Sequence, residues 1–211
     1  MAYEDEEQLE ALKAWWQRNG RVIVIAAVVG LTSVLGWQQW SSWQDRQAAA
    51  AAADYQAVLS ALSQNDREAA TNRVVQLQQD YAKSTYAVLA SLAVATAEMA
   101  DANASDAAAL LGWVSEAQPD SPMAPVARLR QAEALAAAGD NAAALAVLEP
   151  PIQGPLEARF YELRGDLELA QNDKEAAIEA YRSALQRSAG QRRSLVEVKL
   201  FDLGATLEAS S

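Results

Sequence analysis

The sequence predicts an all-α protein in which a single transmembrane helix is followed by a solenoid of helical hairpins. Three observations predict this fold class. Alanine supplies 48 of the 211 residues, against 9 glycines and 6 prolines. One uncharged apolar stretch is long enough to cross a bilayer, and short breaker segments recur along the rest of the chain. Alternating Val, Ile and Thr runs are missing outside residues 21–35, so we expect almost no strand.

The first expected element is a short amphipathic helix inside an acidic segment, residues 1–20. One helical face carries Leu9, Leu12, Trp15 and Trp16, and Asn19-Gly20 is a typical helix stop. We interpret the apolar face as a seat in the membrane interface, and docking to a membrane partner is the alternative.

The second element is a transmembrane signal-anchor helix at residues 21–40. The uncharged run from Val22 to Trp40 is about 28 Å long as a helix, close to the hydrocarbon thickness of the bilayer. Ala26 and Gly30 form a small-xxx-small pair that permits close helix packing in this lipid environment. The anchoring and interfacial-belt residues are Trp15, Trp16, Arg21, Trp37, Trp40 and Trp43.

The flanks of the span predict its orientation. Lys13, Arg18 and Arg21 precede it, whereas Arg46 is the only basic residue shortly after it, so the amino terminus should be cytoplasmic and the rest exported. A cleaved signal peptide is the alternative. The acidic start and the lack of a cleavage site near the apolar core argue against it.

Residues 41–207 predict tetratricopeptide-like repeats, with 208–211 as a tail. Ala177, Ala144 and Ala109 occupy matching places in successive second helices, 33 and 35 residues apart, and the tetratricopeptide period is about 34. Residues 191–207 would cap the array, and a generic helical bundle is the alternative. The repeat signature comprises Ala132, Ala144, Tyr161, Gly165, Ala177, Tyr181 and Ala184.

The repeat register also predicts a candidate groove. Its residues are Arg128, Leu129, Glu133, Arg159, Glu162 and Asp166, a mixed and mainly acidic set that does not suit a clamp for a terminal carboxylate. The alternative is that these charges only solvate the helices. A glycan-cleaving enzyme that uses Glu162 and Asp166 as its two carboxylates is a further alternative, but their i,i+4 spacing is more typical of surface charge.

Composition excludes several functions. The chain has no His and no Cys, which excludes imidazole or thiolate metal sites, disulfides and the common nucleophile–base pairs. No glycine lies in a GxGxxG or GxxxxGK pattern. A net charge of −11 makes nucleic acid a poor partner. We therefore expect no catalytic residue, no cofactor and no metal.

The whole pattern resembles the ancillary SecYEG translocon subunits. The resemblance rests on Tyr3-Glu4-Asp5-Glu6-Glu7, Leu12-Lys13-Ala14-Trp15-Trp16, Gly36-Trp37, Ala143-Ala144-Leu145 and Arg164-Gly165-Asp166. It implies a bacterial inner-membrane protein with a periplasmic repeat domain. The implied partners are the SecYEG translocon, the periplasmic chaperone PpiD, translocated or unfolded polypeptides and the lipid bilayer.

The function that this resemblance implies is a non-enzymatic adaptor that helps pass translocated proteins to periplasmic chaperones. A tetratricopeptide assembly factor for another envelope complex, in cytochrome c maturation or pilus biogenesis, is the alternative.

Overall fold

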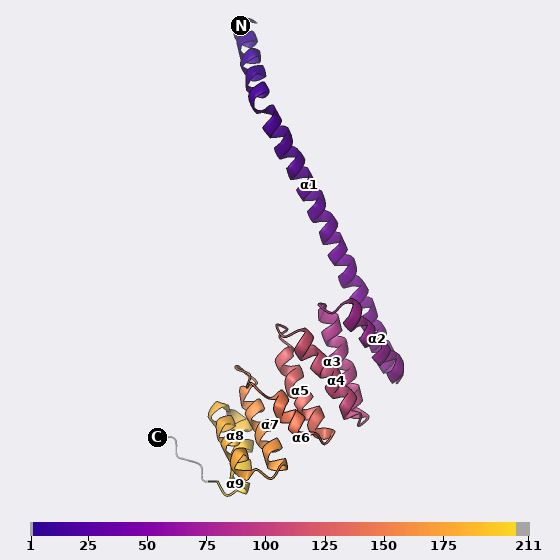
Figure 1. Cartoon of the computed structure of the whole chain (residues 1–211), viewed down its shortest axis with the longest axis vertical. Coiled ribbons are helices and arrows are strands. Elements are labelled where there is room, and N and C mark those ends of the chain that lie inside the picture. The colour runs from indigo at the N-terminus through magenta and orange to yellow at the C-terminus, as the bar shows by residue number, and fades with distance from the viewer. Residues whose placement is uncertain (1, 206–211) are drawn as a thin grey trace. The chain divides into compact units, whose positions relative to one another are not determined.

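A computed structural model describes residues 2–205, with side chains from residue 13 onward, and within that range all regular secondary structure is α-helical (Figure 1). This confirms the predicted all-α fold class. The helices described are α1 (Ala2–Ser63), α2 (Arg67–Asp80), α3 (Thr85–Ala100), α4 (Ala104–Ala117), α5 (Ala124–Ala137), α6 (Asn141–Val147), α7 (Glu157–Ala170), α8 (Lys174–Arg187) and α9 (Gly190–Asp202).

The chain divides into two units, Met1–Ala50 and Ala51–Ser211. The first is the amino-terminal part of α1. Within residues 2–205, α1 is the one helix long and apolar enough to cross a membrane, with a mean hydropathy of 1.8 in its most apolar window. From Trp15 to Trp43 the large apolar side chains of α1 are exposed, because no protein core covers them.

The helix stop expected at Asn19-Gly20 is wrong, because α1 continues through both residues. Asn19 donates its side-chain amide to the carbonyl of Trp15 (3.1 Å) and so caps nothing. Gly20 keeps a helical conformation and lies under the ring of Trp16, where a Cβ would come within 3.0 Å of the ring. The side chains of Leu9 and Leu12 lie outside the described residues.

Four hairpin turns share one construction in the second unit. Each has a residue with positive φ, which is Asn65, Ala102, Gly139 or Asn172. The amide of the next residue then donates to a carbonyl five positions earlier, as in Asp66 to Ala61 (2.9 Å). That next residue, Asp66, Asn103, Asp140 or Asp173, is the N-cap of the second helix. The predicted breakers therefore fall in these turns.

The repeat register differs from the predicted one at one position. Ala70, Ala107, Ala144 and Ala177 all stand four residues after an N-cap and are fully buried, at spacings of 37, 37 and 33 residues. Ala109 is exposed, because it lies two residues further on and points to the opposite side of α4. Ala107, not Ala109, is therefore the matching residue.

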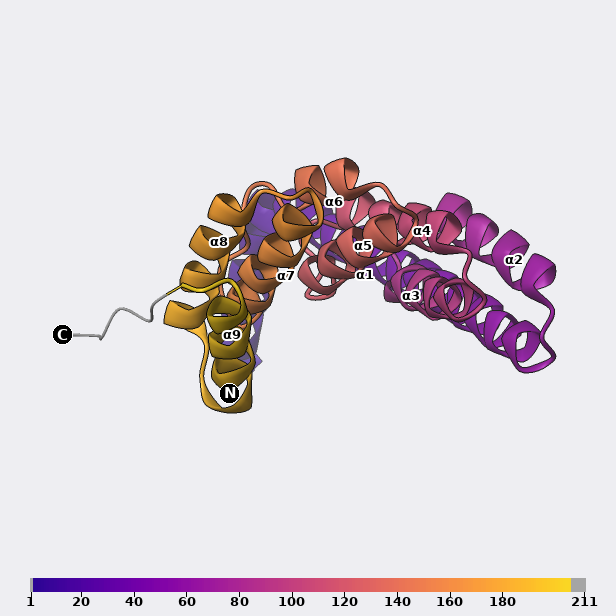
Figure 2. The same ribbon diagram turned by 90° about the horizontal axis from the view of Figure 1, so that it is seen from below.

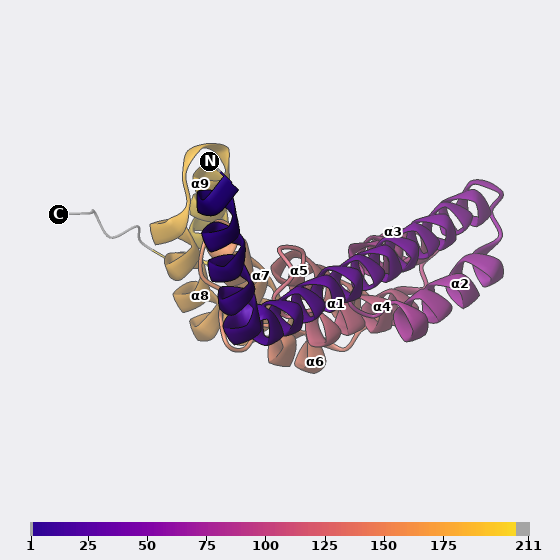
Figure 3. The same ribbon diagram turned by 90° about the horizontal axis from the view of Figure 1, so that it is seen from above.

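In the unit Ala51–Ser211 the hairpins form a curved stack. The second helix of each hairpin lies on the outer side of this stack, and the first helix lies on its inner side (Figure 2). The outer helices are α2, α4, α6 and α8, while α3, α5, α7 and α9 form what we call the inner face; Figure 3 shows the same arrangement from the opposite direction. Neighbouring helices pack in chain order, including α3 on α4, α4 on α5 and α7 on α8. The end of α1 joins the stack through buried Ala51 and Val58.

Candidate protein-binding site on the inner face

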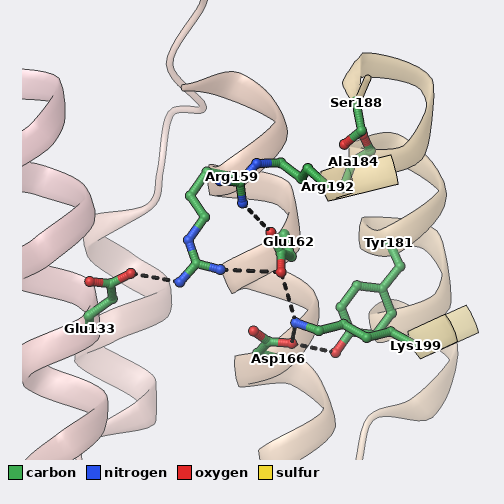
Figure 4. Close-up of polar contacts among 9 residues, drawn as sticks. All are labelled: Glu133, Arg159, Glu162, Asp166, Tyr181, Ala184, Ser188, Arg192 and Lys199. Carbon is green, nitrogen blue, oxygen red and sulfur yellow. Dashed lines mark hydrogen bonds and ion pairs between the residues drawn. The ribbon is translucent and has the colours of Figure 1, made fainter. Parts of the chain in front are cut away.

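A buried carboxylate organises the carboxyl-terminal part of the inner face. Glu162 of α7 is 4% exposed, yet three cations surround it (Figure 4). Arg192 and Lys199 of α9 donate to its two oxygens, at 2.8 and 3.0 Å. A guanidinium nitrogen of Arg159, one turn earlier on α7, lies 3.3 Å from a carboxylate oxygen of Glu162. A buried carboxylate is stable only with such partners, so these ion pairs hold α9 against α7.

The network extends to two further helices. Arg159 donates to Glu133 of α5 at 2.8 Å. On the other side, Lys199 donates to Asp166 at 2.6 Å, and the hydroxyl of Tyr181 on α8 donates to the same Asp166 oxygen at 2.7 Å. One chain of polar contacts therefore joins α5, α7, α8 and α9.

The electrostatics keep this network in one protonation state at neutral pH. Burial alone would raise the pKa of Glu162, but the hydrogen bond and charge of Lys199 and the charge of Arg159 lower that pKa below its ordinary value. Burial raises the pKa of Tyr181, and its hydrogen bond to the Asp166 carboxylate raises it further. Glu162 is thus ionised and Tyr181 protonated, which suits a structural network better than acid–base chemistry.

The predicted groove residues separate into two groups. Glu133, Arg159, Glu162 and Asp166 come together in the network, but α9 lies over Glu162. Leu129 is only 7% exposed and packs in a core with Ala132 and Ala144, so its assignment to an accessible groove is wrong.

Arg128 does not reach the inner face either. Its guanidinium donates to the carbonyl of Val147 (2.9 Å) and to that of Pro150, and it lies 5.3 Å from the centre of the Phe160 ring. Arg128 therefore links α5 to the end of α6 and to the segment that follows α6. The repeat period of the sequence indicates where Arg128 lies along α5, but it does not indicate the direction in which the Arg128 side chain points.

The predicted repeat-signature residues lie at helix contacts. Ala132, Ala144, Ala177, Ala184 and Tyr181 are buried. Gly165 lies directly against the ring of Tyr181, since a Cβ there would be 2.5 Å from Cε1. Tyr161 is partly buried, and the Arg187 guanidinium lies 4.6 Å from the centre of its ring.

Sequence reasoning missed a hollow further toward the amino end of the inner face. It has a volume of about 190 Å³ and is lined by Ala95, Thr96 and Met99 of α3, Leu111 of α4, and Arg130 and Glu133 of α5. Placing Ala109 in the repeat register set α4 two residues out of phase, so Leu111 was not recognised as a contact between helices. Counting the register of α4 from its N-cap Asn103 identifies Leu111 as such a contact and so locates the hollow.

Comparison with known proteins gives full-length matches. Residues 13–205 match the tetratricopeptide repeat-like domain family. The ancillary SecYEG translocon subunit of Haemophilus influenzae is 30% identical over 205 residues, which is 96% of this chain and 100% of that protein. The protein of the same name from Aggregatibacter actinomycetemcomitans has the same identity and coverage. That of Escherichia coli K12 is 28% identical over 188 residues, 87% of this chain and 89% of its own.

The chain belongs to the family of ancillary SecYEG translocon subunits. Membership of this family and one apolar helix near the amino terminus suit a single-pass inner-membrane protein with a Sec-associated role.

The apolar part of α1 has polar groups of the kind that a lipid environment tolerates. Thr32 and Ser33 donate their hydroxyls to the carbonyls of Val28 (2.8 Å) and Val29 (2.7 Å), so neither hydroxyl is left without a partner. Nothing lies within 4 Å of the position that a Cβ on Gly30 would take, and Ala26 is also exposed. That surface is open to a partner helix or to lipid.

The predicted belt residues of this family member are all exposed. Trp15, Trp16 and Arg21 lie before the apolar run, while Trp37 and Trp40 lie at its end and Trp43 just beyond it, at three-residue intervals. Trp37 is the most exposed, at 79%. Large exposed aromatic rings at both ends of an apolar run are typical of a membrane interface.

Proposed function

We propose that this chain is a non-enzymatic inner-membrane adaptor of the Sec translocon. Residues 21–40 cross the membrane, with residues 1–20 in the cytoplasm and the repeat domain, residues 41–207, in the periplasm. The repeat domain contacts other proteins and helps pass translocated polypeptides to periplasmic chaperones such as PpiD.

One combination of observations carries the proposal. The chain is similar over 96% of its length to proteins named ancillary SecYEG translocon subunit, and α1, the one membrane-length apolar helix within residues 2–205, runs without interruption to Ser63. Residues 13–205 match the tetratricopeptide repeat-like domain family. Helical repeats expose long surfaces that suit extended or helical segments of other proteins.

The charge distribution around the span supports the orientation. Lys13, Arg18 and Arg21 lie on the amino-terminal side of the apolar run, and cytoplasmic flanks of membrane spans are enriched in such residues. A thiol-labelling experiment tests this directly, because the chain has no native Cys. In intact spheroplasts, a membrane-impermeant maleimide should label Gln64→Cys, whereas Lys13→Cys should react only after the inner membrane is permeabilised. The reverse pattern would overturn the orientation.

Affinity purification tests the partners. Full-length protein extracted in a mild detergent should co-purify SecY, SecE and SecG, together with PpiD. A control variant that carries an unrelated apolar span of the same length shows whether the native span contributes to this binding. Recovery of neither translocon nor chaperone, or recovery of cytochrome c maturation or pilus components in their place, would contradict the proposal.

A further inference from the structure

The hollow between α3 and α5 combines an apolar floor with a polar edge. Ala95 and Leu111 are nearly fully buried beneath it, and Met99 of α3 is 36% exposed at its wall. Arg130 and Glu133, one turn apart on α5, supply the opposite edge. A hollow of about 190 Å³ is smaller than the pockets that enclose drug-sized ligands. It is of a size to receive one side chain of a larger ligand.

The two charges at this edge are not equivalent. Glu133 is held by Arg159 at 2.8 Å, so its charge is already balanced. Arg130 is exposed and makes no ion pair with any other residue between 13 and 205. An exposed guanidinium beside an apolar wall is a suitable partner for a ligand carboxylate, because it presents several donors in a planar fork.

The surrounding inner face does not repel an acidic ligand, although the domain as a whole is acidic. Residues 41–211 contain 14 basic and 23 acidic side chains, a net charge of −9. Between the hollow and α9, Arg130 and the polar network together have four cations and three carboxylates, so this set has a net charge of +1. These residues are Arg130, Glu133, Arg159, Glu162, Asp166, Arg192 and Lys199.

We infer that the hollow binds a polypeptide segment in which a large apolar side chain is next to an acidic residue. The apolar side chain enters between Met99 and Leu111, and the carboxylate lies against Arg130. The inference deepens the proposed function and rests on it, because it states which segments of an unfolded polypeptide the repeat domain selects.

Labelled peptides test the inference on the full-length protein in nanodiscs. The probe is an eleven-residue Gly-Ser peptide with Glu-Leu-Glu at its centre. Matched peptides carry Lys-Leu-Lys or Glu-Ser-Glu there. Fluorescence anisotropy should show that Glu-Leu-Glu binds about tenfold more tightly than either matched peptide, the change that one charge-assisted contact or one buried Leu side chain can supply.

A matched pair of charge reversals locates the site. Arg182 on α8 is also exposed and forms no ion pair between residues 13 and 205, but it lies on an outer helix. Arg130→Glu should weaken Glu-Leu-Glu binding about tenfold or more, and Arg182→Glu should leave it unchanged, although both alter the net charge equally. Circular dichroism checks that both variants stay folded.

Two results would overturn the inference: equal or tighter binding of Lys-Leu-Lys, or equal effects of the two charge reversals. Co-purification with SecYEG, measured on the unaltered protein, separates this inference from the proposed function. If the unaltered protein retains SecYEG but shows no peptide preference, only the binding site is contradicted. If the unaltered protein does not retain SecYEG, the proposed function itself is contradicted.

Discussion

Gly165 is the position where a single methyl group should have the largest effect on packing. The Tyr181 ring occupies the space that a Cβ would need, at 2.5 Å, and the ring cannot move freely because its hydroxyl is bonded to Asp166 at 2.7 Å. We expect Gly165→Ala to lower the free energy of unfolding by about 1–3 kcal/mol, since overpacking outweighs the helix propensity that Ala adds. Urea denaturation followed by circular dichroism measures this.

Gly112 is the control for that prediction. A Cβ there would meet only the end of the Gln131 side chain, at 2.7 Å, and a flexible amide can turn away. Gly112→Ala should therefore be neutral or stabilising by up to about 1 kcal/mol. Equal stability of Gly165→Ala and Gly112→Ala would contradict the close packing of α7 against the Tyr181 ring.

Glu162 should make stability depend on pH. Its pKa in the folded protein lies below the ordinary value of 4.5, so its ion pairs contribute fully above that value and are lost as the pH falls through the lowered folded pKa. Glu162→Gln should lower the free energy of unfolding by about 2 kcal/mol at pH 7, and the difference from the unaltered protein should shrink below pH 4.5. Denaturation midpoints measured across this pH range give the comparison.

The control for Glu162→Gln is the same substitution at Glu179, an exposed residue on α8. Glu179→Gln should change the free energy of unfolding little, since exposed charges contribute little to stability. A constant Glu162→Gln effect from pH 7 to pH 3 would show that ionisation of Glu162 contributes nothing.

Among the repeated hairpin turns, the one between α3 and α4 is strained. Its positive-φ residue is Ala102 (φ 65°), whereas the other turns use Asn or Gly. Ala102→Gly should stabilise the domain by about 0.5–1 kcal/mol, because glycine relieves a left-handed alanine but makes the unfolded chain more flexible. Ala138 has φ −76° next to the turn between α5 and α6, and Ala138→Gly should destabilise by a similar amount. Thermal denaturation of both variants tests the pair, and the same sign for both would contradict the turn geometry.

Helix α9 should behave as the end of a linear array. Leu200 is 1% exposed, whereas its neighbour Phe201 is 78% exposed. Leu200→Ala should lower the free energy of unfolding by about 2–5 kcal/mol. It should also increase amide hydrogen exchange in α8 and α9 more than in α3 and α4, since repeats are coupled mainly to their neighbours. Phe201→Ala should leave exchange in all four helices almost unchanged. A uniform loss of protection after Leu200→Ala would mean that the domain opens as one unit.

The elements were more predictable than the contacts between them. Asp and Asn caps after left-handed residues are local signals, so the turns were found from the sequence. The phase of α4 was not, because in the run from Ala107 to Ala109 every residue is alanine and only the N-cap decides which one faces inward. The stop at Asn19-Gly20 failed because both residues are also compatible with a continuous helix. Their local preference is weaker than the tendency of the long flanking segments to stay helical.

At the scale of the molecule, the sequence predicted an apolar helix followed by hairpin repeats, because both features rest on periodicity and composition. It did not predict the charge of the inner face. That charge depends on α9 bringing Arg192 and Lys199 back to Glu162, from which they are 30 and 37 residues away in the chain. Contacts of this kind join distant segments, and the repeat period contains no information about them.

Site-specific photocrosslinking in intact membranes tests the central claim most directly. A photoreactive amino acid is placed at Val28 in the apolar run, at Met99 on the inner face, or at Arg182 on the outer side, and the products are identified by mass spectrometry. Val28 should crosslink to SecYEG subunits, and Met99 should crosslink to translocating polypeptides far more than Arg182 does. A Sec adaptor with a binding inner face would be contradicted if Val28 gave no SecYEG product, or if Met99 and Arg182 gave the same polypeptide products at the same yield.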